Sequence, residues 1–198
     1  MERQRHILLA AVVTFTASWM LTGCGTGEKE MEEGEVRESW EGVHNAISSI
    51  QPTAGNTCKG SVTFEDVTGG IHVHASLSGL APNSQHGFHV HEFAFCGSAD
   101  ATCTGGHYDP EKTGHHALPG ASEGHHAGDM GNIVADANGN AEYDAVIKGI
   151  SIAGENAIIG RAVIIHGKPD DGGQPTGNAG SRIGVGDIGI AAPPAAKK

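Results

Sequence analysis

Apolar and polar residues alternate along much of the central chain, which is the pattern of strands with one buried face. Within residues 71–78, Ile71, Val73, Ala75 and Leu77 share one side, and histidines and serines share the other. Residues 61–65 alternate in the same way, and further strands are expected at 87–91, 131–135, 141–147, 162–166 and 184–190. Short strands separated by turn-forming sequences predict an all-β domain, a β-sandwich or barrel.

Two long segments interrupt the regular spacing of these strands. Glu92 to Met130 and Gly167 to Arg182 are irregular and rich in glycine, histidine, aspartate and proline. Long loops in a compact β domain usually carry function. We therefore expect the chemistry of the protein in these two loops.

The start of the chain has the composition of an export signal. Basic residues precede an uncharged, mostly apolar run over residues 7–21, and small residues then lead to Cys24. This build predicts a signal peptide over residues 1–23. Its end resembles a bacterial lipobox, so a lipid on the Cys24 thiol is expected to tether the chain to a membrane. The alternative is an ordinary signal followed by a chance cysteine.

Residues 24–54 differ sharply from the strand-rich region. They hold seven glutamates against Lys29 and Arg37 and contain few apolar residues, which predicts an acidic flexible tether. The spacing of Val36, Trp40, Val43 and Ile47 also allows a short helix there. The folded domain is expected over residues 55–192, and residues 193–198 form a C-terminal tail.

Composition narrows the class of protein further. The chain has 198 residues, 31 of them glycine, which fits one β domain and excludes a coiled coil. Its formal net charge of −11 would repel a polyanion, so nucleic acid is excluded as a partner. Thirteen histidines are many for this length, and most lie between His72 and His166.

The spacing of these histidines predicts a transition-metal site. His89 and His91 are two apart on an expected strand, so both imidazoles point to the same side. They lead into the loop that contains His107, His115, His116, His125, His126 and Asp129. Imidazoles with one carboxylate suit zinc or copper better than magnesium or calcium. His72 and His74 have the same spacing, but their strand has its apolar face on the other side, so we expect them to face solvent.

Six ordered motifs resemble those of the copper/zinc superoxide dismutases. They are Gly87-Phe88-His89-Val90-His91-Glu92-Phe93, Gly106-His107-Tyr108-Asp109-Pro110, Gly128-Asp129-Met130-Gly131-Asn132, Ile158-Ile159-Gly160-Arg161, His166-Gly167-Lys168-Pro169-Asp170-Asp171 and Gly177-Asn178-Ala179-Gly180-Ser181-Arg182. The resemblance extends over about residues 57–192. It implies an all-β fold, an eight-stranded Greek-key β-barrel or sandwich with two long functional loops.

The resemblance also implies two metal ions that share one ligand. The residues that match copper ligands are His89, His91, His107 and His166. The residues that match zinc ligands are His107, His126, Asp129 and either His115 or His116. The spacing of bacterial members points to His116, and the shorter spacing of eukaryotic members points to His115.

The implied activity is the dismutation of superoxide to dioxygen and hydrogen peroxide. Copper would carry the electron, and zinc would position the bridging His107. Asp170 matches an aspartate that links a copper histidine to a zinc histidine. Arg182 matches a cation beside the copper that attracts the anionic substrate. A copper or zinc buffer or carrier on the same fold is the alternative function.

The cysteines depart from the family pattern. The family usually has a cysteine shortly after the Arg182 motif, and this chain has none there. With Cys24 lipidated, Cys58, Cys96 and Cys103 allow three pairings and one leftover thiol. We favour Cys96–Cys103, which would pin the first loop locally. The signal predicts an exported protein, lipid-anchored on the periplasmic or outer side of a bacterial membrane; monomer and homodimer both fit.

Overall fold

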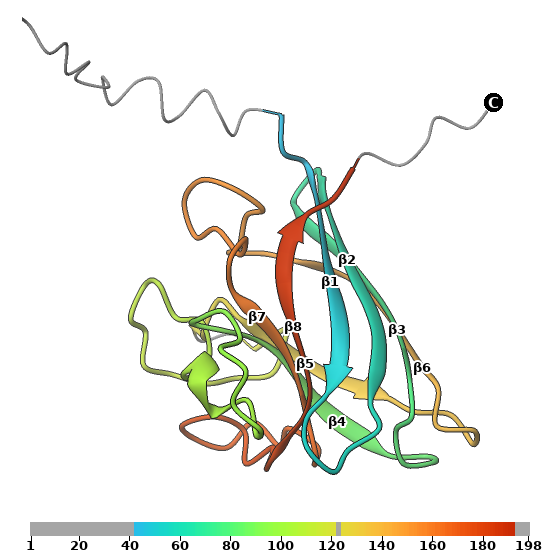
Figure 1. The fold of residues 1–198 in the computed structure, drawn as a ribbon. Helices are drawn as coiled ribbons and strands as arrows, with labels where there is room; N and C mark the ends of the chain where they lie inside the picture. The colour runs from blue at the N-terminus through green and yellow to red at the C-terminus, as the bar shows by residue number, and fades with distance from the viewer. Residues whose placement is uncertain (1–41, 122–123, 193–198) are drawn as a thin grey trace, which may run out of the picture. The chain divides into compact units, whose positions relative to one another are not determined.

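The computed structural model describes residues 42–121 and 124–192, which form an eight-stranded antiparallel sheet (Figure 1). The strands are β1 (Asn45–Pro52), β2 (Lys59–Val67), β3 (Gly70–Ser78), β4 (Gln85–His91), β5 (Asp129–Val134), β6 (Ala141–Ile147), β7 (Ala162–His166) and β8 (Arg182–Ile190). The described residues contain one short 3-10 helix, Thr102–Thr104, and no α-helix. The all-β prediction is confirmed.

The strands follow the order β5-β4-β7-β8-β1-β2-β3-β6 and close into a nearly complete barrel. The chain passes from β3 to β4, and later from β6 to β7, without pairing those strands, which is Greek-key connectivity. A bridge between Ala135 and Ala141 brings the two end strands, β5 and β6, together. The eight-stranded Greek-key barrel implied by the motifs is therefore the observed fold.

Strand β1 corrects the expected tether over residues 24–54. Residues 45–52 pair with β2 on one side and with β8 on the other. Ala46, Ser48 and Ile50 are buried and alternate with outward residues. Hydrogen bonding to two neighbours and burial of this face stabilise a segment that is too polar to fold alone. The short helix that the spacing of Val43 and Ile47 allows is not formed at these positions, because Ile47 lies in β1.

The barrel interior is filled by the alternating apolar residues. Ile50, Phe64, Phe88 and Ile133 are among the largest fully buried side chains, each at most 1% exposed. Strand β4 departs from alternation because every residue after Gln85 is buried. One side of β4 packs in the core, and the other side is covered by the β4–β5 loop and the β7–β8 loop, which keep the histidines of β4 away from solvent.

Three long connections leave the barrel. Two are the loops expected from the sequence, between β4 and β5 and between β7 and β8. The third, residues 148–161 between β6 and β7, was not singled out by composition, and it contributes Ile150, Ile152 and Ile158 to the core. The first two loops carry the histidines and lie beside the β4–β7 wall.

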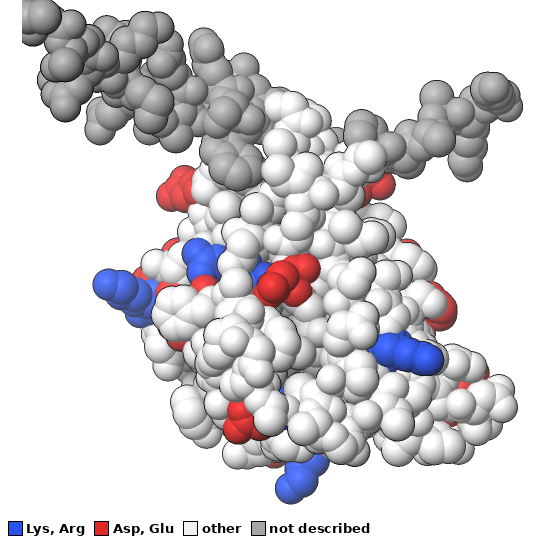
Figure 2. Space-filling model, in the orientation of Figure 1, with Lys and Arg blue, Asp and Glu red and all other residues white. Residues whose placement is uncertain are grey.

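The predicted signal, Cys24 and most of the acidic tether lie outside the described residues. Within the described part of the chain, no helix has the length and apolar character needed to cross a bilayer. On the face in Figure 2, acidic and basic side chains are interspersed over a largely uncharged surface. Residues 42–192 contain 15 acidic and six basic residues, so most of the formal net charge of −11 lies in this part of the chain rather than among the N-terminal glutamates.

Candidate metal centre

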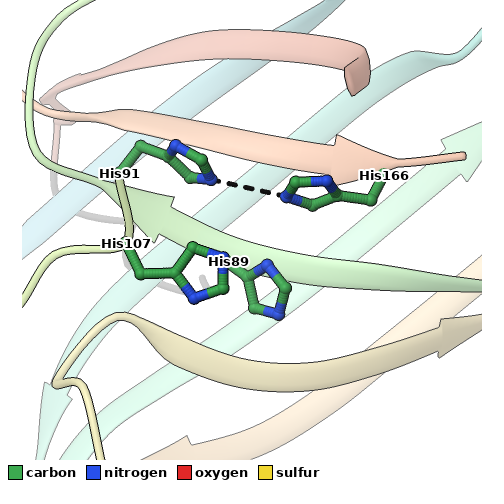
Figure 3. A group of neighbouring side chains, drawn as sticks. All are labelled: His89, His91, His107 and His166. Atoms are coloured by element: carbon green, nitrogen blue, oxygen red, sulfur yellow. Dashed lines mark hydrogen bonds between the residues drawn. The ribbon is translucent and has the colours of Figure 1, made fainter. Parts of the chain in front are cut away.

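Four buried imidazoles meet beside strands β4 and β7. His89 and His91 project from the same side of β4, His166 ends β7, and His107 comes from the first loop, where it forms a backbone bridge with His91. Each is at most 6% exposed. In Figure 3 the rings of His91 and His166 point toward each other, and His89 and His107 lie beside them. One ring nitrogen of each lies within 4.8 Å of the other three.

Hydrogen bonds determine which nitrogen of each ring faces this group. The Nδ1 of His91 donates to the carbonyl of Gly105 (3.0 Å), and the Nδ1 of His166 donates to that of Gly180 (3.2 Å). Carbonyl oxygens only accept, so the Nε2 atoms of these two rings are unprotonated acceptors, and they lie 3.4 Å apart. This is the form of imidazole that binds a metal.

The other two rings present a nitrogen that has no protein partner. The Nδ1 of His89 and the Nε2 of His107 are buried, and neither has a hydrogen-bond partner among the described residues. Buried polar atoms normally have a hydrogen-bond partner, so a nitrogen without one indicates that a group other than the protein binds it. A metal ion bound by all four nitrogens is such a group, and the four imidazoles fit copper.

A second group shares His107 with the first. Asp129, the first residue of β5, lies 2.7 Å through Oδ1 from the Nδ1 of His107 and 2.9 Å through Oδ2 from the Nδ1 of His116. The Nδ1 of His126 is 3.5 Å from the same carboxylate. The contacts of His116 and His126 lack the alignment of a hydrogen bond, and these two nitrogens are otherwise unpartnered in the described chain. Three imidazoles and a carboxylate fit zinc.

Of the two adjacent histidines that the sequence leaves as alternatives, His116 enters this second group. It is 1% exposed, whereas His115 is only partly buried and belongs to neither group of potential ligands. The backbone N–H of His116 donates to Gln174 (2.9 Å), and the Gln174 amide donates back to the carbonyl of His116 (2.6 Å). The second loop therefore fixes which histidine of the first loop turns inward.

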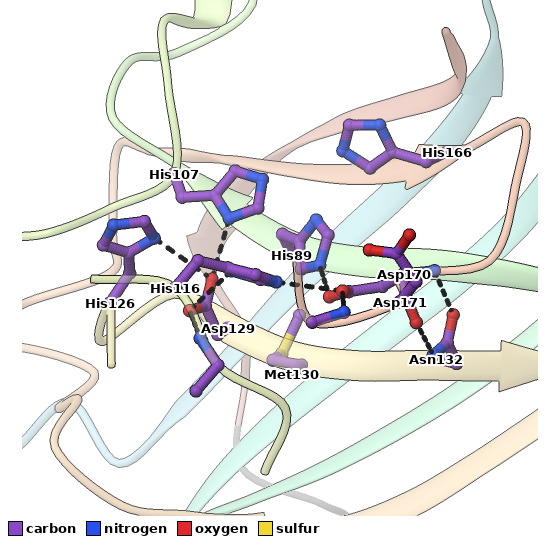
Figure 4. A network of polar contacts seen from close by, with 12 residues as sticks. His89, His107, His116, His126, Asp129, Met130, Asn132, His166, Asp170 and Asp171 are labelled. Atoms are coloured by element: carbon purple, nitrogen blue, oxygen red, sulfur yellow. Dashed lines mark hydrogen bonds and ion pairs between the residues drawn. The ribbon is translucent and has the colours of Figure 1, made fainter. Parts of the chain in front are cut away.

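Asp170 joins the two groups (Figure 4). Its Oδ2 accepts from the Nε2 of His89 (2.8 Å), and its Oδ1 accepts from the Nε2 of His116 (2.9 Å). Asn132 holds the Asp170 backbone from both sides, at 2.7 and 2.9 Å. Gly177 has φ +70°, and a Cβ there would come within 2.0 Å of Asp170 Oδ1, so only glycine fits.

Burial and the carboxylates set the charges at the site. Burial lowers the pKa of His89 to about 4 and that of His166 to about 3, so both rings are neutral at pH 7. Burial alone would raise the pKa of Asp129 and Asp170, but their bonds to histidines outweigh it and hold both pKa values below the ordinary range. Burial also acts to lower the pKa of His116, yet these two carboxylates raise it to about 9.

Arg182 places a fixed positive charge next to the four imidazoles. Its guanidinium donates to the carbonyls of Ala101 (2.5 Å) and Gly105 (2.6 Å) and to the hydroxyl of Thr104 (2.9 Å). Burial lowers the pKa of Arg182, but an arginine stays charged at any ordinary pH. Its contacts place this charge close to two of the rings, because the Gly105 carbonyl that it binds also accepts from His91, and Arg182 lies opposite His166 in the pairing of β7 with β8.

A disulfide closes part of the β4–β5 loop, the segment whose backbone carbonyls accept hydrogen bonds from Arg182. Cys96 and Cys103 are bonded, as predicted, and Cys58 is a free thiol buried in the core. Burial raises the pKa of the Cys58 thiol to about 12. Ala101, inside the disulfide loop, has φ 57°, a left-handed conformation that turns its carbonyl toward Arg182.

Comparisons with known proteins agree with this geometry. Residues 58–188 match the family model of copper/zinc superoxide dismutase (SODC). The chain belongs to the copper/zinc superoxide dismutase family. It is 43% identical to "Superoxide dismutase [Cu-Zn] 3" of Arabidopsis thaliana over 68% of this chain and 85% of that protein. It is 42% identical to "Superoxide dismutase [Cu-Zn]" of Paramecium bursaria Chlorella virus 1, over 75% of this chain and 81% of that one.

A solved structure has the same fold. The crystal structure of the clock protein EA4 superposes with a TM-score of 0.67 and 39% identity, over 75% of this chain and 96% of that chain. As a copper/zinc superoxide dismutase, the chain dismutates superoxide to dioxygen and hydrogen peroxide with copper and zinc as cofactors.

Some supporting residues of the dismutase centre were given no role from the sequence. Arg161 stacks over Tyr108, with 3.5 Å from Cζ to the ring centroid, and donates to the carbonyl of Glu92 (2.6 Å). It therefore links the two ends of residues 92–108, the part of the first loop that contains His107. Asn132 supports Asp170, as described above. Both residues lie inside the family motifs, but no local pattern in the sequence reveals their partners.

Proposed function

We propose that copper is bound by His89 Nδ1 and by the Nε2 atoms of His91, His107 and His166, and that zinc is bound by Asp129 and by the Nδ1 atoms of His107, His116 and His126. The observation that carries this assignment is the set of buried ring nitrogens without hydrogen-bond partners in the described chain. Each of them faces one of the two groups, and the opposite nitrogen of His89 and of His116 is held by Asp170.

His107 is the residue common to both sets. Its Nδ1 lies against Asp129, and its Nε2 faces the imidazoles of His89, His91 and His166. With both ions bound, the ring would therefore hold one of them through each of its two nitrogens. Asp170 supports the same arrangement from the other side, because it orients one histidine of each set.

The chemistry is divided between the cofactor and the chain. Copper supplies the electron transfer, because it alternates between two oxidation states while zinc does not. Arg182 attracts superoxide and orients it beside the four imidazoles. The Nε2 of His107 could take up a proton only while it is not bound to copper, and it would then be the group that passes this proton to the product peroxide.

The direct test measures copper, zinc and dismutation on one preparation of residues 25–198 made in an oxidising compartment. About one copper and one zinc per chain, with activity that depends on copper, is the expected result. A chain that binds both metals stoichiometrically but does not dismutate superoxide would contradict the catalytic assignment and favour the buffer or carrier. The charge of Arg182 beside the site favours catalysis, because a storage protein has no need to attract an anion.

We also propose that this is a bacterial, exported protein held on a membrane by a lipid on Cys24. The support is the basic and apolar start of the chain, the small residues before Cys24 and the acidic stretch after it. A disulfide in the first loop is in keeping with an oxidising compartment. Expression with labelled palmitate should label the wild type in the membrane fraction, and Cys24→Ala should remove the label and release the protein. Unlabelled, soluble wild type would refute the anchor.

A further inference from the structure

We infer that the outer face of β3 and β6 carries a separate site for a divalent transition-metal ion, formed by His72, His74 and Asp144 and supported by Glu142. The two histidines alternate with the buried Ile71 and Val73, so both point out of the barrel. None of the four residues belongs to the dismutase centre.

The sheet register brings the acidic residues to the histidines. His74 lies directly opposite Asp144 on β6, and Ser76 lies opposite Glu142. Directly opposite side chains are neighbours on a sheet face, and diagonal ones are within reach of long side chains. The Asp144 carboxylate lies between the two rings, with Oδ1 3.1 Å from the Nε2 of His72 and Oδ2 3.5 Å from the Nδ1 of His74.

The two imidazoles and the carboxylate therefore share one region of the surface, but as the side chains stand their ligand atoms do not all lie within 4.8 Å of one another. The side chains of His72, His74 and Asp144 are 34%, 47% and 69% exposed, so small rotations can close them on an ion while water completes its coordination. A hollow of about 350 Å³ lies on the β2 side of the two histidines, where Thr63 and Glu65 also line it, and Asp144 on β6 is not part of it.

The opposite side of His74 has the support expected of a metal ligand. Its Nε2 lies 3.6 Å from Oε2 of Glu142, and the other oxygen of Glu142 accepts from the hydroxyl of Ser76 at 2.7 Å. Histidines that bind metals usually donate their second N–H to a carboxylate, which fixes the ring orientation and raises ligand basicity. Glu142 is placed to do this when the Nδ1 of His74 holds an ion.

The chemistry selects the class of ion. Two imidazoles and one carboxylate suit Zn²⁺ or Cu²⁺, whereas Mg²⁺ and Ca²⁺ prefer oxygen ligands. Stability does not explain the cluster, because exposed ion pairs contribute only about 0–1 kcal/mol. Asp144 is also ready to bind a cation, since its bond to His72 holds the pKa of that carboxyl below its ordinary value.

The test begins with the purified protein already loaded with copper and zinc at the buried centre. Equilibrium dialysis against Zn²⁺, followed by elemental analysis, should show one further equivalent per chain. The double variant His72→Gln/His74→Gln should lose this equivalent while it keeps the two buried metals and full dismutase activity. Glu142→Gln should weaken binding of the extra ion roughly tenfold, because it removes only the support of His74.

His44→Gln is the matched control. His44 is exposed and contacts Asp66 at 3.0 Å, but it has no second imidazole in the contact, so this variant should still bind the extra ion. Cu²⁺ offered in place of Zn²⁺ should give a second copper signal in electron paramagnetic resonance, with nitrogen couplings that the double variant lacks. Wild type that stops at two ions, or a double variant that still takes up the extra equivalent, would overturn the inference.

Discussion

Asp170→Asn tests the link between the two metal groups while it changes the side chain by one atom. The carboxylate accepts one hydrogen bond from His89 and one from His116. An asparagine has one oxygen that accepts and one nitrogen that only donates. One of the two imidazoles must therefore face an N–H group, which forces its ring nitrogen to accept and places a proton on the nitrogen that should bind the metal.

The size of the effect follows from the lost bond. A hydrogen bond to a charged group contributes about 1.5–3 kcal/mol, and each 1.4 kcal/mol corresponds to about a factor of ten in binding. Affinity for the metal on the affected side should therefore fall roughly 10–100-fold, the range typical of residues that support metal ligands. Competition with a coloured chelator measures the affinity of the apoprotein for copper and for zinc separately.

Asp171→Asn is the matched control for this experiment. Asp171 is the neighbouring acid, but it is exposed and bonds to Asn178 and to the backbone of Gly173 rather than to a histidine. Both metal affinities of this variant should match those of the wild type. If Asp170→Asn also binds copper and zinc within about threefold of the wild type, the argument from the bridging carboxylate is wrong.

Four further outcomes are expected. Arg182→Gln should lower kcat/KM for superoxide about tenfold with unchanged copper and zinc content, and unchanged activity at low salt would remove the steering role. His107→Ala should lose at least about 100-fold in activity even when both metals are bound, whereas a fully loaded variant with normal turnover would refute the bridge. Cys58 should react with a thiol reagent only after unfolding, because it is buried and the pKa of its thiol is about 12; modification of the native protein would contradict this. Cys96→Ser/Cys103→Ser should lower the free energy of unfolding by about 2 kcal/mol in denaturant titrations, since the bond closes a loop with a separation of only 7 residues.

Most strands can be predicted from the sequence because apolar and polar residues alternate along them, and this alternation shows which side chains are buried. Seven of the eight were expected within a few residues of their observed bounds. Strand β1 was missed since its inward positions include Ser48, which is fully buried, and Ala46, which is only weakly hydrophobic. Its structure depends on pairing with β2 and β8, and the residues of β8 lie more than 130 positions away. Such a long-range contact leaves little signal in a short window of sequence.

In the candidate site as well, some placements follow from the local sequence, and others depend on contacts with residues far along the chain. The same-side placement of His89 and His91 follows from strand geometry alone. The inward turn of His116 rather than His115 depends on Asp129, Asp170 and Gln174, which lie in later parts of the chain. Adjacent histidines in a loop have no fixed sidedness, so only these partners distinguish them.

The disulfide has a consequence for how the protein matures. Cys96 and Cys103 lie in one loop, so their bond crosslinks neither the loop to a strand nor one strand to another. Two thiols this close in the chain meet readily before the barrel has formed, since closing a short loop costs little entropy. Oxidation and barrel closure can therefore occur in either order, and an intact disulfide does not report that the barrel is folded.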